Sequence, residues 1–467
     1  MTSTTLPAAG DGITMDRPTP EGPRPALTGR LVGPAGPSWD ADRTAWNLAV
    51  DQRPAFVGRA ADADDVAAIV RFAGEQGLRV APQATGHGAA ALGDLTGTVL
   101  LRTDDLREIR VDAERRRVRV GAGVTWGEVS RALAPFGLIG LAGSAHDVGV
   151  VGYTLGGGCS WLARKHGLAA SHVTAVELVT GDGAFHRADA TTDPDLFWSV
   201  RGGGGTTGVV TAIEFEALPI GEIYAGALLF PLDRAAEVLA GYAAWTTDVD
   251  ESATTCIRLL RLPPMPDLPE FLSGKSFVAI DGAVDRPAGE AERLLAPLRA
   301  CGPVVDTFTT MPATELDRIH LDPPHPVPFA ADGLSIDRLT EPVIAALLQV
   351  AGPGVQTSLL AVELRHLGGA AGRRDPAGGC VDHLPGQFLA LGLGPVPGPE
   401  FADRVAADVA ALVGALEPWA AERHYRNFVD SPLPPTAFHA PEELVRLRRI
   451  RAEHDPAGVI RSSHPLD

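Results

Sequence analysis

The first part of the chain alternates apolar runs typical of strands with apolar spacings typical of helices. PAFVGRA, residues 54–60, predicts a short strand, and DADDVAAIVRFAGEQG, residues 62–77, predicts a helix capped by Asp62 or Asp64. LRVAPQ follows as a further apolar run. Because strands joined through a helix usually run parallel, this segment predicts a strand–helix–strand unit.

The pattern then changes to hairpins. REIRVD and RVRVGAG flank the polar turn AERR, and HVTAVELVTGDGAFHRADA has two alternating runs around Gly181-Asp182-Gly183. Between these hairpins, VTWGEVSRALAPFG predicts a short helix.

Beyond about residue 219, amphipathic helices alternate with single strands. Helices are predicted near residues 233–247, 288–300, 337–351 and 399–420. Strands are predicted near residues 276–283, 357–366 and 387–393. Helices on one face of an antiparallel sheet produce this pattern, so we expect an α+β protein.

Composition and charge narrow the possible functions. A length of 467 residues favours two or three domains of roughly 150 residues each. The formal net charge of −18 argues against a nucleic-acid partner, because such binding relies on Lys and Arg. The sequence shows neither a membrane-spanning apolar run nor a secretory signal, so no membrane partner and a cytoplasmic location are expected. Four scattered cysteines predict free thiols and no metal site: Cys159, Cys256, Cys301 and Cys380.

Three glycine-rich segments carry candidate chemistry. They are residues 82–88 (PQATGHG), 143–158 (GSAHDVGVVGYTLGGG) and 201–210 (RGGGGTTGVV). Such loops expose backbone N–H groups to anions and let the backbone approach a flat or phosphorylated ligand. Each loop alone is more often a tight turn. The sequence has no P-loop motif and no dinucleotide fingerprint of the GxGxxG type in the required context.

In this order and spacing, the segments resemble the berberine-bridge-enzyme-like oxidases of the vanillyl-alcohol-oxidase superfamily. The resemblance covers nearly the whole chain from about Ser38, and it is carried by strings that include QATGHG, DVGVVGYTLGGGCSWLARKHGL, DPDLFWSVRGGGG, VELRHLGGAAG and HYRNF. The combination is specific because LGGGxxWxxRxxGL and DLFWxxRGGGG are unlikely to occur together by chance. It implies FAD as cofactor and a PCMH-type FAD-binding domain of two subdomains over residues 38–219. It also implies a substrate-binding domain over residues 220–424, with an antiparallel sheet flanked by helices. Residues 425–467 are expected to return to the FAD-binding domain, and residues 1–37 to form a mobile arm.

The resemblance also implies how the cofactor is held. His87 stands where the family bonds a histidine covalently to the methyl group of the flavin's benzenoid ring; the alternative is that it only hydrogen-bonds the cofactor. Many relatives add a cysteinyl tether, but Ala145 occupies that position, so we expect one tether and interpret Cys159 as a small buried side chain. Val148 resembles the oxidases, in which a small branched residue is thought to gate oxygen access. The other residues implied to bind the cofactor are Gln83, Ala84, Thr85, Gly86, Gly88, Gly143, Ser144, Asp147, Gly149, Gly152, Tyr153, Leu155, Gly156, Gly157, Gly158, Gly208, Val210 and Asn427.

The resemblance leaves the catalytic base open. Many relatives end in a YxNY motif whose last tyrosine takes the substrate proton, whereas this chain ends the motif with Phe428, which cannot ionise. In the strand VELRH, Glu363 and Arg365 share one face and His366 lies on the other. A buried Glu or a neutral His can work near pH 7, although each such residue is more often structural. The candidates are Tyr425, Glu363, His366 and His383.

The function expected from this resemblance is an FAD-dependent oxidoreductase. We expect an oxidase that takes hydride from a C–H next to O or N of a small organic substrate, such as a secondary metabolite, alcohol or sugar, and reduces O2 to H2O2. The alternative is a flavoenzyme that tailors a secondary metabolite by oxidative cyclisation or a redox-neutral rearrangement. A third possibility is a flavin- or ligand-binding protein without catalysis.

Overall fold

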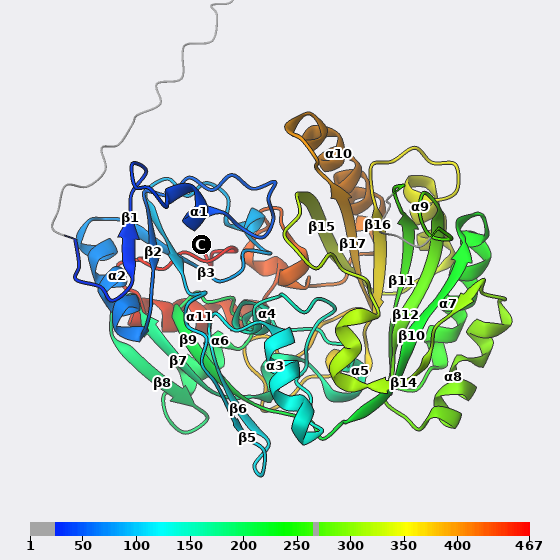
Figure 1. Cartoon of the computed structure of the whole chain (residues 1–467), viewed down its shortest axis with the longest axis horizontal. Coiled ribbons are helices and arrows are strands. Elements are labelled where there is room, and N and C mark those ends of the chain that lie inside the picture. The colour runs from blue at the N-terminus through cyan, green and yellow to red at the C-terminus, as the bar shows by residue number, and fades with distance from the viewer. Residues whose placement is uncertain (1–23, 265–269) are drawn as a thin grey trace, which may run out of the picture.

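The computed structural model describes residues 24–264 and 270–467, which form three sheets with their covering helices (Figure 1). Residues 1–23 of the expected arm lie outside this description. Within the rest of that arm, β1 (Arg30–Val32) pairs antiparallel with β2 (Phe56–Arg59), which corrects the expectation that order begins at Ser38. A run of three residues is too short to show a period, and its order comes from the sheet edge on which it pairs.

The first sheet has four strands in the order β1-β2-β4-β3. As predicted, β3 (Arg79–Gln83) and β2 run parallel to β4 (Thr98–Arg102), on either side of it. The connecting helix α2 (Ala63–Glu75) buries Val66, Ile69 and Val70 against this sheet. Of the two possible caps, Asp62 is the one used, because its carboxylate accepts the N–H of Asp65 at 2.9 Å.

A five-stranded sheet, ordered β5-β6-β9-β7-β8, lies next to the first sheet (Figure 1). Its strands are β5 (Ile109–Asp112), β6 (Arg117–Gly121), β7 (Val173–Thr180), β8 (Phe185–Asp189) and β9 (Gly208–Glu216). The helices among these strands are α3 (Trp126–Leu133), α4 (Val150–Leu155), α5 (Ala163–His166) and α6 (Pro194–Val200). A short helix, α1 (Trp39–Arg43), precedes β2.

The C-terminal segment packs on these two sheets. Helix α11 (Pro441–His454) contributes Ile450 to the core of the five-stranded sheet. Val80 of β3 then exchanges backbone hydrogen bonds with Val459 and Arg461, at 2.7 and 2.8 Å. The last residues therefore lie alongside the strand that leads into the first glycine loop.

The remaining sheet is antiparallel and has eight strands. Its main path runs β13 (Val305–Asp306), β10 (Glu222–Pro231), β12 (Ser276–Val284), β11 (Ala253–Arg261), β16 (Ala361–His366), β17 (Phe388–Pro395) and β15 (Phe329–Ile336), and β14 (Thr309–Pro312) pairs with β10. Helices cover one face: α7 (Ala235–Asp248), α8 (Ala288–Ala300), α9 (Glu341–Ala351) and α10 (Pro399–Leu416). The expected α+β class, with an antiparallel sheet flanked by helices, is confirmed.

Several strands of this sheet escaped prediction from the sequence. Strand β11 is buried on both faces, so its side chains do not alternate between apolar and polar. Strand β15 mixes Asp332 and Gly333 into its run, which weakens the strand pattern. In the described part of the chain, no helix combines the length and the apolar character needed to cross a membrane.

Candidate active site

A cavity of about 1280 Å³ lies between the glycine-rich loops and the open face of the eight-stranded sheet. One wall consists of the loops near residues 82–92, 143–156 and 204–210. The opposite wall includes side chains of β11, β16 and β17, and residues 425–430 and 461–464 contribute from the C-terminal segment. Pockets for one drug-sized ligand measure roughly 300–1,000 Å³. This cavity can therefore hold a large cofactor and a substrate together.

The first glycine loop leaves the end of β3 with a tight turn. Gly86 has φ +90°, and a Cβ there would lie 2.9 Å from the Cβ of Ala45. Only glycine fits this position without moving the neighbouring chain. Gln83 and Gln52 exchange side-chain hydrogen bonds of 2.9 and 3.0 Å, which fix the strand end before the turn.

The second loop meets the C-terminal motif at Gly156. A Cβ on Gly156 would lie 1.8 Å from Oδ1 of Asn427, so this glycine makes room for the amide. Asn427 donates from Nδ2 to the carbonyl oxygen of Tyr153 at 2.9 Å. The second glycine loop and the C-terminal motif, which are far apart in the sequence, are thus hydrogen-bonded to each other at the cavity wall.

The lining agrees closely with the residues implied to bind the cofactor. All of them line the cavity except Asp147, Gly157 and Gly158. A Cβ on Gly158 would approach the Tyr153 ring to 2.6 Å and Ala169 to 2.7 Å. These two glycines therefore shape the turn after α4 instead of lining the cavity, which corrects the expectation for them.

The residues present fit FAD. The hydroxyl of Tyr153 is buried and has no hydrogen-bond partner among the described residues. Leaving such a group unpaired costs roughly 1–3 kcal/mol, so this hydroxyl indicates a polar ligand in the cavity. The glycine loops provide the close backbone approach that a flat, phosphorylated ligand requires. His87 and Tyr153 would hold it near its ring system, and the loop backbone would hold its phosphates.

The ring of His87 is fixed by its neighbours. Trp46 stacks on it with ring centroids 4.2 Å apart and an interplanar angle of 21°. Nδ1 of His87 lies 2.8 Å from Oγ1 of Thr85, and Nε2 lies 3.5 Å from Oδ1 of Asp147. Burial raises the pKa of Asp147, but its contacts with His87 and Trp46 outweigh burial and lower it.

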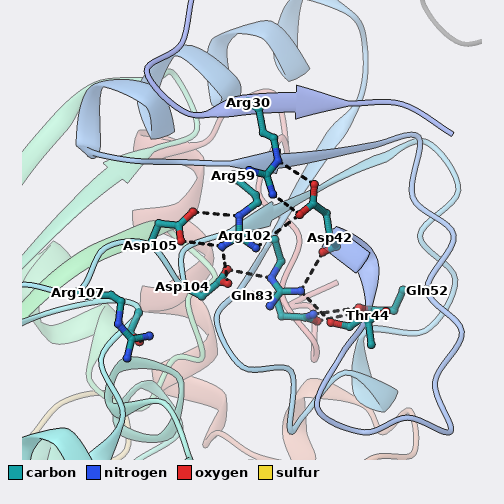
Figure 2. A network of polar contacts seen from close by, with 11 residues as sticks. Arg30, Asp42, Thr44, Gln52, Arg59, Gln83, Arg102, Asp104, Asp105 and Arg107 are labelled. Carbon is teal, nitrogen blue, oxygen red and sulfur yellow. Dashed lines mark hydrogen bonds and ion pairs between the residues drawn. The ribbon is translucent and has the colours of Figure 1, made fainter. Parts of the chain in front are cut away.

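An ion-pair network holds the segment that carries Trp46 (Figure 2). Arg102 donates from Nη1 to the carbonyl oxygens of Asp42 and Thr44, at 2.9 Å each. Arg30 pairs with Asp42 through Nε and Nη2, at 2.9 and 2.5 Å. Burial raises the pKa of Asp42, but the hydrogen bonds from Arg30 and Ser38 lower it overall. These contacts hold the chain before Trp46 against β1 and β4.

The eight-stranded sheet presents a buried acid–base cluster to the cavity. Nε2 of His320 lies 3.0 Å from Oε2 of Glu363, while Nδ1 of the same ring hydrogen-bonds Oδ2 of Asp281. Arg365 donates from Nε to Oε1 of Glu363 at 3.1 Å, and Arg258 donates from Nε to Oδ1 of Asp281 at 3.1 Å. Arg365 also reaches Oγ of Ser144 at 3.1 Å, which links the cluster to the second glycine loop.

The protonation states of this cluster follow from its geometry. Burial raises the pKa of Glu363, but Arg365 and His320 outweigh it and hold the pKa far below its ordinary value. Burial and Arg258 lower the pKa of His320, yet Asp281 raises it overall. Ionised carboxylates only accept hydrogen bonds, so both ring nitrogens of His320 must carry hydrogen. His320 is therefore an imidazolium between two carboxylates.

Tyr425 lines the cavity wall as a packed aromatic. Its side chain is buried, and its hydroxyl accepts hydrogen bonds from the backbone N–H of Cys159 at 3.1 Å and from Nδ2 of Asn427 at 2.9 Å. Burial raises its pKa. Burial also raises the pKa of the Cys159 thiol, to about 11. Neither group is poised to ionise near neutral pH.

Comparisons with known proteins agree with this geometry. Residues 54–189 match the family model described as an FAD binding domain. The (R)-6-hydroxynicotine oxidase of Paenarthrobacter nicotinovorans is 27% identical over 95% of this chain and 97% of its own. The chain is an FAD-dependent oxidoreductase, and its fold is similar to that of a berberine-bridge-enzyme-like protein.

Solved structures share the fold of this oxidoreductase. The BBE-like 1 protein of Physcomitrella patens superposes with a TM-score of 0.81 at 18% identity, over 94% of this chain and 97% of its own. A glucooligosaccharide oxidase of Acremonium strictum, which carries a 6-S-cysteinyl, 8α-N1-histidyl FAD, superposes with a TM-score of 0.79 at 20% identity, over 94% and 97% of the two chains.

Two candidate bases of the oxidoreductase do not line the cavity. His366 points to the helix-covered side of its strand and packs on Phe388, with ring centroids 5.3 Å apart. Because side chains alternate along a strand, Glu363 and His366 cannot share the cavity face. His383 is held by Asp382, at 2.5 Å, and by Arg423, also outside the lining. Both expectations are corrected.

Several residues of the site escaped prediction: Trp46, Arg258, Asp281 and His320. Arg258 and Asp281 each stand alone as a charge inside an apolar strand, and such isolated charges are rarely buried without a partner. The sequence therefore contained a signal by which Arg258 and Asp281 could have been found. His320 lies in a Pro-rich loop and gave no periodic signal at all.

Proposed function

We propose that this FAD-dependent oxidoreductase is an oxidase that takes hydride from a C–H bond next to O or N of a small organic substrate. When bound, FAD supplies the two-electron chemistry and passes the electrons to O2, giving H2O2. One observation carries the proposal. The cavity that joins the glycine loops to the open sheet face also contains the Glu363–His320 pair.

Within this proposal, Glu363 is the catalytic residue that accepts the substrate's O–H or N–H proton as the hydride leaves. Arg365 and His320 keep this carboxylate ionised, so it presents an acceptor to the substrate throughout the neutral range. The link from Arg365 to Ser144 holds the carboxylate at a fixed distance from the second glycine loop. A base fixed in this way is pre-organised for proton transfer.

The cluster beside Glu363 carries nearly balanced charges. Three cations, Arg258, His320 and Arg365, stand against the carboxylates of Asp281, Glu363 and Asp322, and Asp322 also lines the cavity. This balance gives no electrostatic preference for a charged substrate. The nearby walls are apolar, through Leu260, Phe277, Ile319, Leu391 and Leu393. We therefore propose an uncharged, largely apolar alcohol or phenol as the substrate class.

The cofactor is proposed to be tethered once, through His87. Support comes from the imidazole in the cavity wall and from the histidyl link of the glucooligosaccharide oxidase. Ala145 lines the cavity at the position expected for a second, cysteinyl link, and its methyl group cannot form one. Acid precipitation tests this: yellow colour should stay with the wild-type pellet and pass to the supernatant in His87→Ala.

The oxidase proposal is tested by a peroxide-release screen. Purified yellow protein is offered uncharged alcohols, phenols, sugars and amines, with O2 consumption and H2O2 measured together. We expect stoichiometric O2 loss and peroxide with the first two classes. If none of these substrates bleached the flavin under anaerobic conditions, the proposed oxidation would be contradicted.

A second candidate function rests on Phe428. Phe428 has no ionisable group, whereas many relatives end this motif with a tyrosine. The guanidinium of Arg365 lies 5.0 Å from the centre of the Phe428 ring. A tailoring enzyme that closes a ring oxidatively, or rearranges its substrate without net oxidation, would suit this change. Turnover without O2 loss would favour the redox-neutral version over the oxidase.

A further inference from the structure

The structure assigns Asp147 the task of positioning His87 for its bond to the flavin. This inference rests on the proposed attachment at His87 and goes beyond it, because it names the residue that prepares the histidine. Asp147 is a positioning residue in this account, since it acts through the imidazole and does not line the cavity.

Two buried atoms without partners face each other at this point. Nε2 of His87 and Oδ1 of Asp147 lie 3.5 Å apart, and neither makes a hydrogen bond within the described part of the chain. Buried polar atoms almost always have a hydrogen-bond partner. A small movement of either side chain would let this adjacent donor and acceptor form a hydrogen bond with each other. Catalytic hydrogen bonds are often long before the ligand is present and shorten once it binds.

Trp46 fixes both members of the pair. Its indole Nε1 donates to Oδ2 of Asp147 at 2.5 Å, and its ring stacks on the imidazole of His87. The carboxylate therefore has one oxygen occupied and the other directed at Nε2. The imidazole cannot swing away without losing its contact with the indole.

The remaining ring nitrogen is the one available for bonding. Among residues 24–264 and 270–467, Nδ1 of His87 has a hydrogen-bond contact with the Thr85 hydroxyl alone, at 2.8 Å, and a hydroxyl can donate to a lone pair or rotate away from it. A carboxylate that holds the Nε2 proton fixes the tautomer in which Nδ1 carries a lone pair. This is the form of imidazole that can attack carbon.

In the attachment step a bond forms between Nδ1 of His87 and the methyl carbon, one methyl C–H bond breaks, and Asp147 takes up the Nε2 proton of the imidazole. The two electrons released reduce O2, the same acceptor used in the proposed reaction. The methyl proton and the proton held by Asp147 complete H2O2. Asp147 thus offsets the positive charge that would otherwise build up on the alkylated ring.

The test follows covalent attachment and does not depend on turnover. Full-length protein is incubated with excess FAD, and the covalent fraction is read over time by intact mass and by acid-stable colour. Asp147→Asn should slow attachment at least tenfold while FAD still binds reversibly. Wild-type rates in D147N would overturn the inference. Attachment in His87→Ala would overturn the tether itself, which keeps the two failures distinguishable.

The chain offers a matched control. Asp285 and His166 form another Asp–His pair at 2.8 Å, with side-chain exposures of 19% and 21%, against 20% and 22% for Asp147 and His87. Neither residue of the control pair lines the cavity. Asp285→Asn should leave the attachment rate unchanged.

Two further variants separate positioning from a merely structural role. Asp147→Ala should regain part of its attachment rate in sodium formate but not in sodium chloride, because formate replaces the missing carboxylate. Trp46→Phe keeps a stacking ring but removes the donor to Asp147, so attachment should slow by a smaller factor than in D147N. If D147N cannot retain FAD, these two variants test the positioning role of Asp147. That role is overturned if formate does not restore attachment in Asp147→Ala, or if attachment in W46F proceeds at the wild-type rate.

Discussion

Nε2 of His320 lies 3.0 Å from Oε2 of Glu363, and this contact joins a loop before β15 to the middle of β16 at the wall of the cavity. A buried carboxylate beside an imidazolium and a guanidinium stays ionised when isolated carboxylates would take up a proton. The site is thus built around an acceptor whose charge does not depend on pH in the neutral range.

Replacing Glu363 with Gln should remove the proton acceptor. We expect kcat to fall by roughly 10²–10⁴-fold with a smaller change in KM, because general-base catalysis contributes about that much. The low pKa of Glu363 also predicts that the wild-type enzyme shows no acidic loss of kcat from this group between pH 5 and pH 8, roughly the range in which histidine titrates. Steady-state kinetics on a substrate found in the peroxide screen measure both effects.

His366→Asn provides the control for that measurement. His366 lies three residues along the same strand but on the opposite face, where burial holds its pKa well below the ordinary value. This variant should lose stability while keeping the wild-type pH profile of kcat. A changed pH profile in H366N, or unchanged kcat in E363Q, would contradict the assignment.

Tyr425→Phe should affect stability more than chemistry. The change removes the acceptor for the N–H of Cys159 and one acceptor for Asn427, which leaves a buried donor unpaired. We expect a loss of about 1–2 kcal/mol in the free energy of unfolding, measured by denaturant titration. The pH dependence of kcat should not move, because burial raises the pKa of this phenol. If wild-type kcat rose with pH and Y425F lost that rise, Tyr425 would be identified as a base after all.

Asp430 should make stability depend on pH. Burial, and then the neighbouring charge of Asp332, raise its pKa from 3.8 to about 7. The folded state keeps this proton after the unfolded chain has lost it, so stability falls as pH rises through this range and levels off above about pH 7. Asp430→Asn should remove this loss, worth up to about 4 kcal/mol at pH 8.

Melting temperatures between pH 4 and pH 8 measure the effect of Asp430→Asn. The exposed Asp403 on α10 provides the control, because Asp403→Asn should follow the wild-type pH dependence. Equal slopes for wild type and D430N would show that Asp430 does not carry the effect.

Arg102→Met should loosen the segment that carries Trp46. Arg102 is buried and satisfies two backbone carbonyls besides its contact with Asp104 at 3.1 Å (Figure 2). We expect a stability loss of roughly 2–4 kcal/mol and slower covalent attachment of FAD, because the indole would no longer be held over His87. Arg53→Met changes an arginine whose side chain is 77% exposed and should cost at most about 0.5 kcal/mol. Thermal unfolding and the attachment time course compare the two.

The sequence by itself determined the features that depend on local physics. Gly86 lies in a loop whose turn favours glycine, and the helix after β2 needs an acidic cap, for which the sequence offered Asp62 and Asp64 and the structure uses Asp62. Glu363 and Arg365 share a face because strands have a period of two. These features were predictable from short stretches of sequence. The same period excluded His366 from the face of Glu363, although both remained candidates until the cavity face was known.

Only the tertiary structure decided which distant residues meet. His320 reaches Glu363 across 43 positions of the chain, and Trp46 reaches Asp147 across 101. No periodic pattern in the sequence predicts either contact. The side-chain directions in a loop are fixed by the surfaces on which the loop packs and not by its own hydrogen-bond pattern. The charge state of Glu363 likewise depends on neighbours from other strands and loops, since electrostatic interactions act through space.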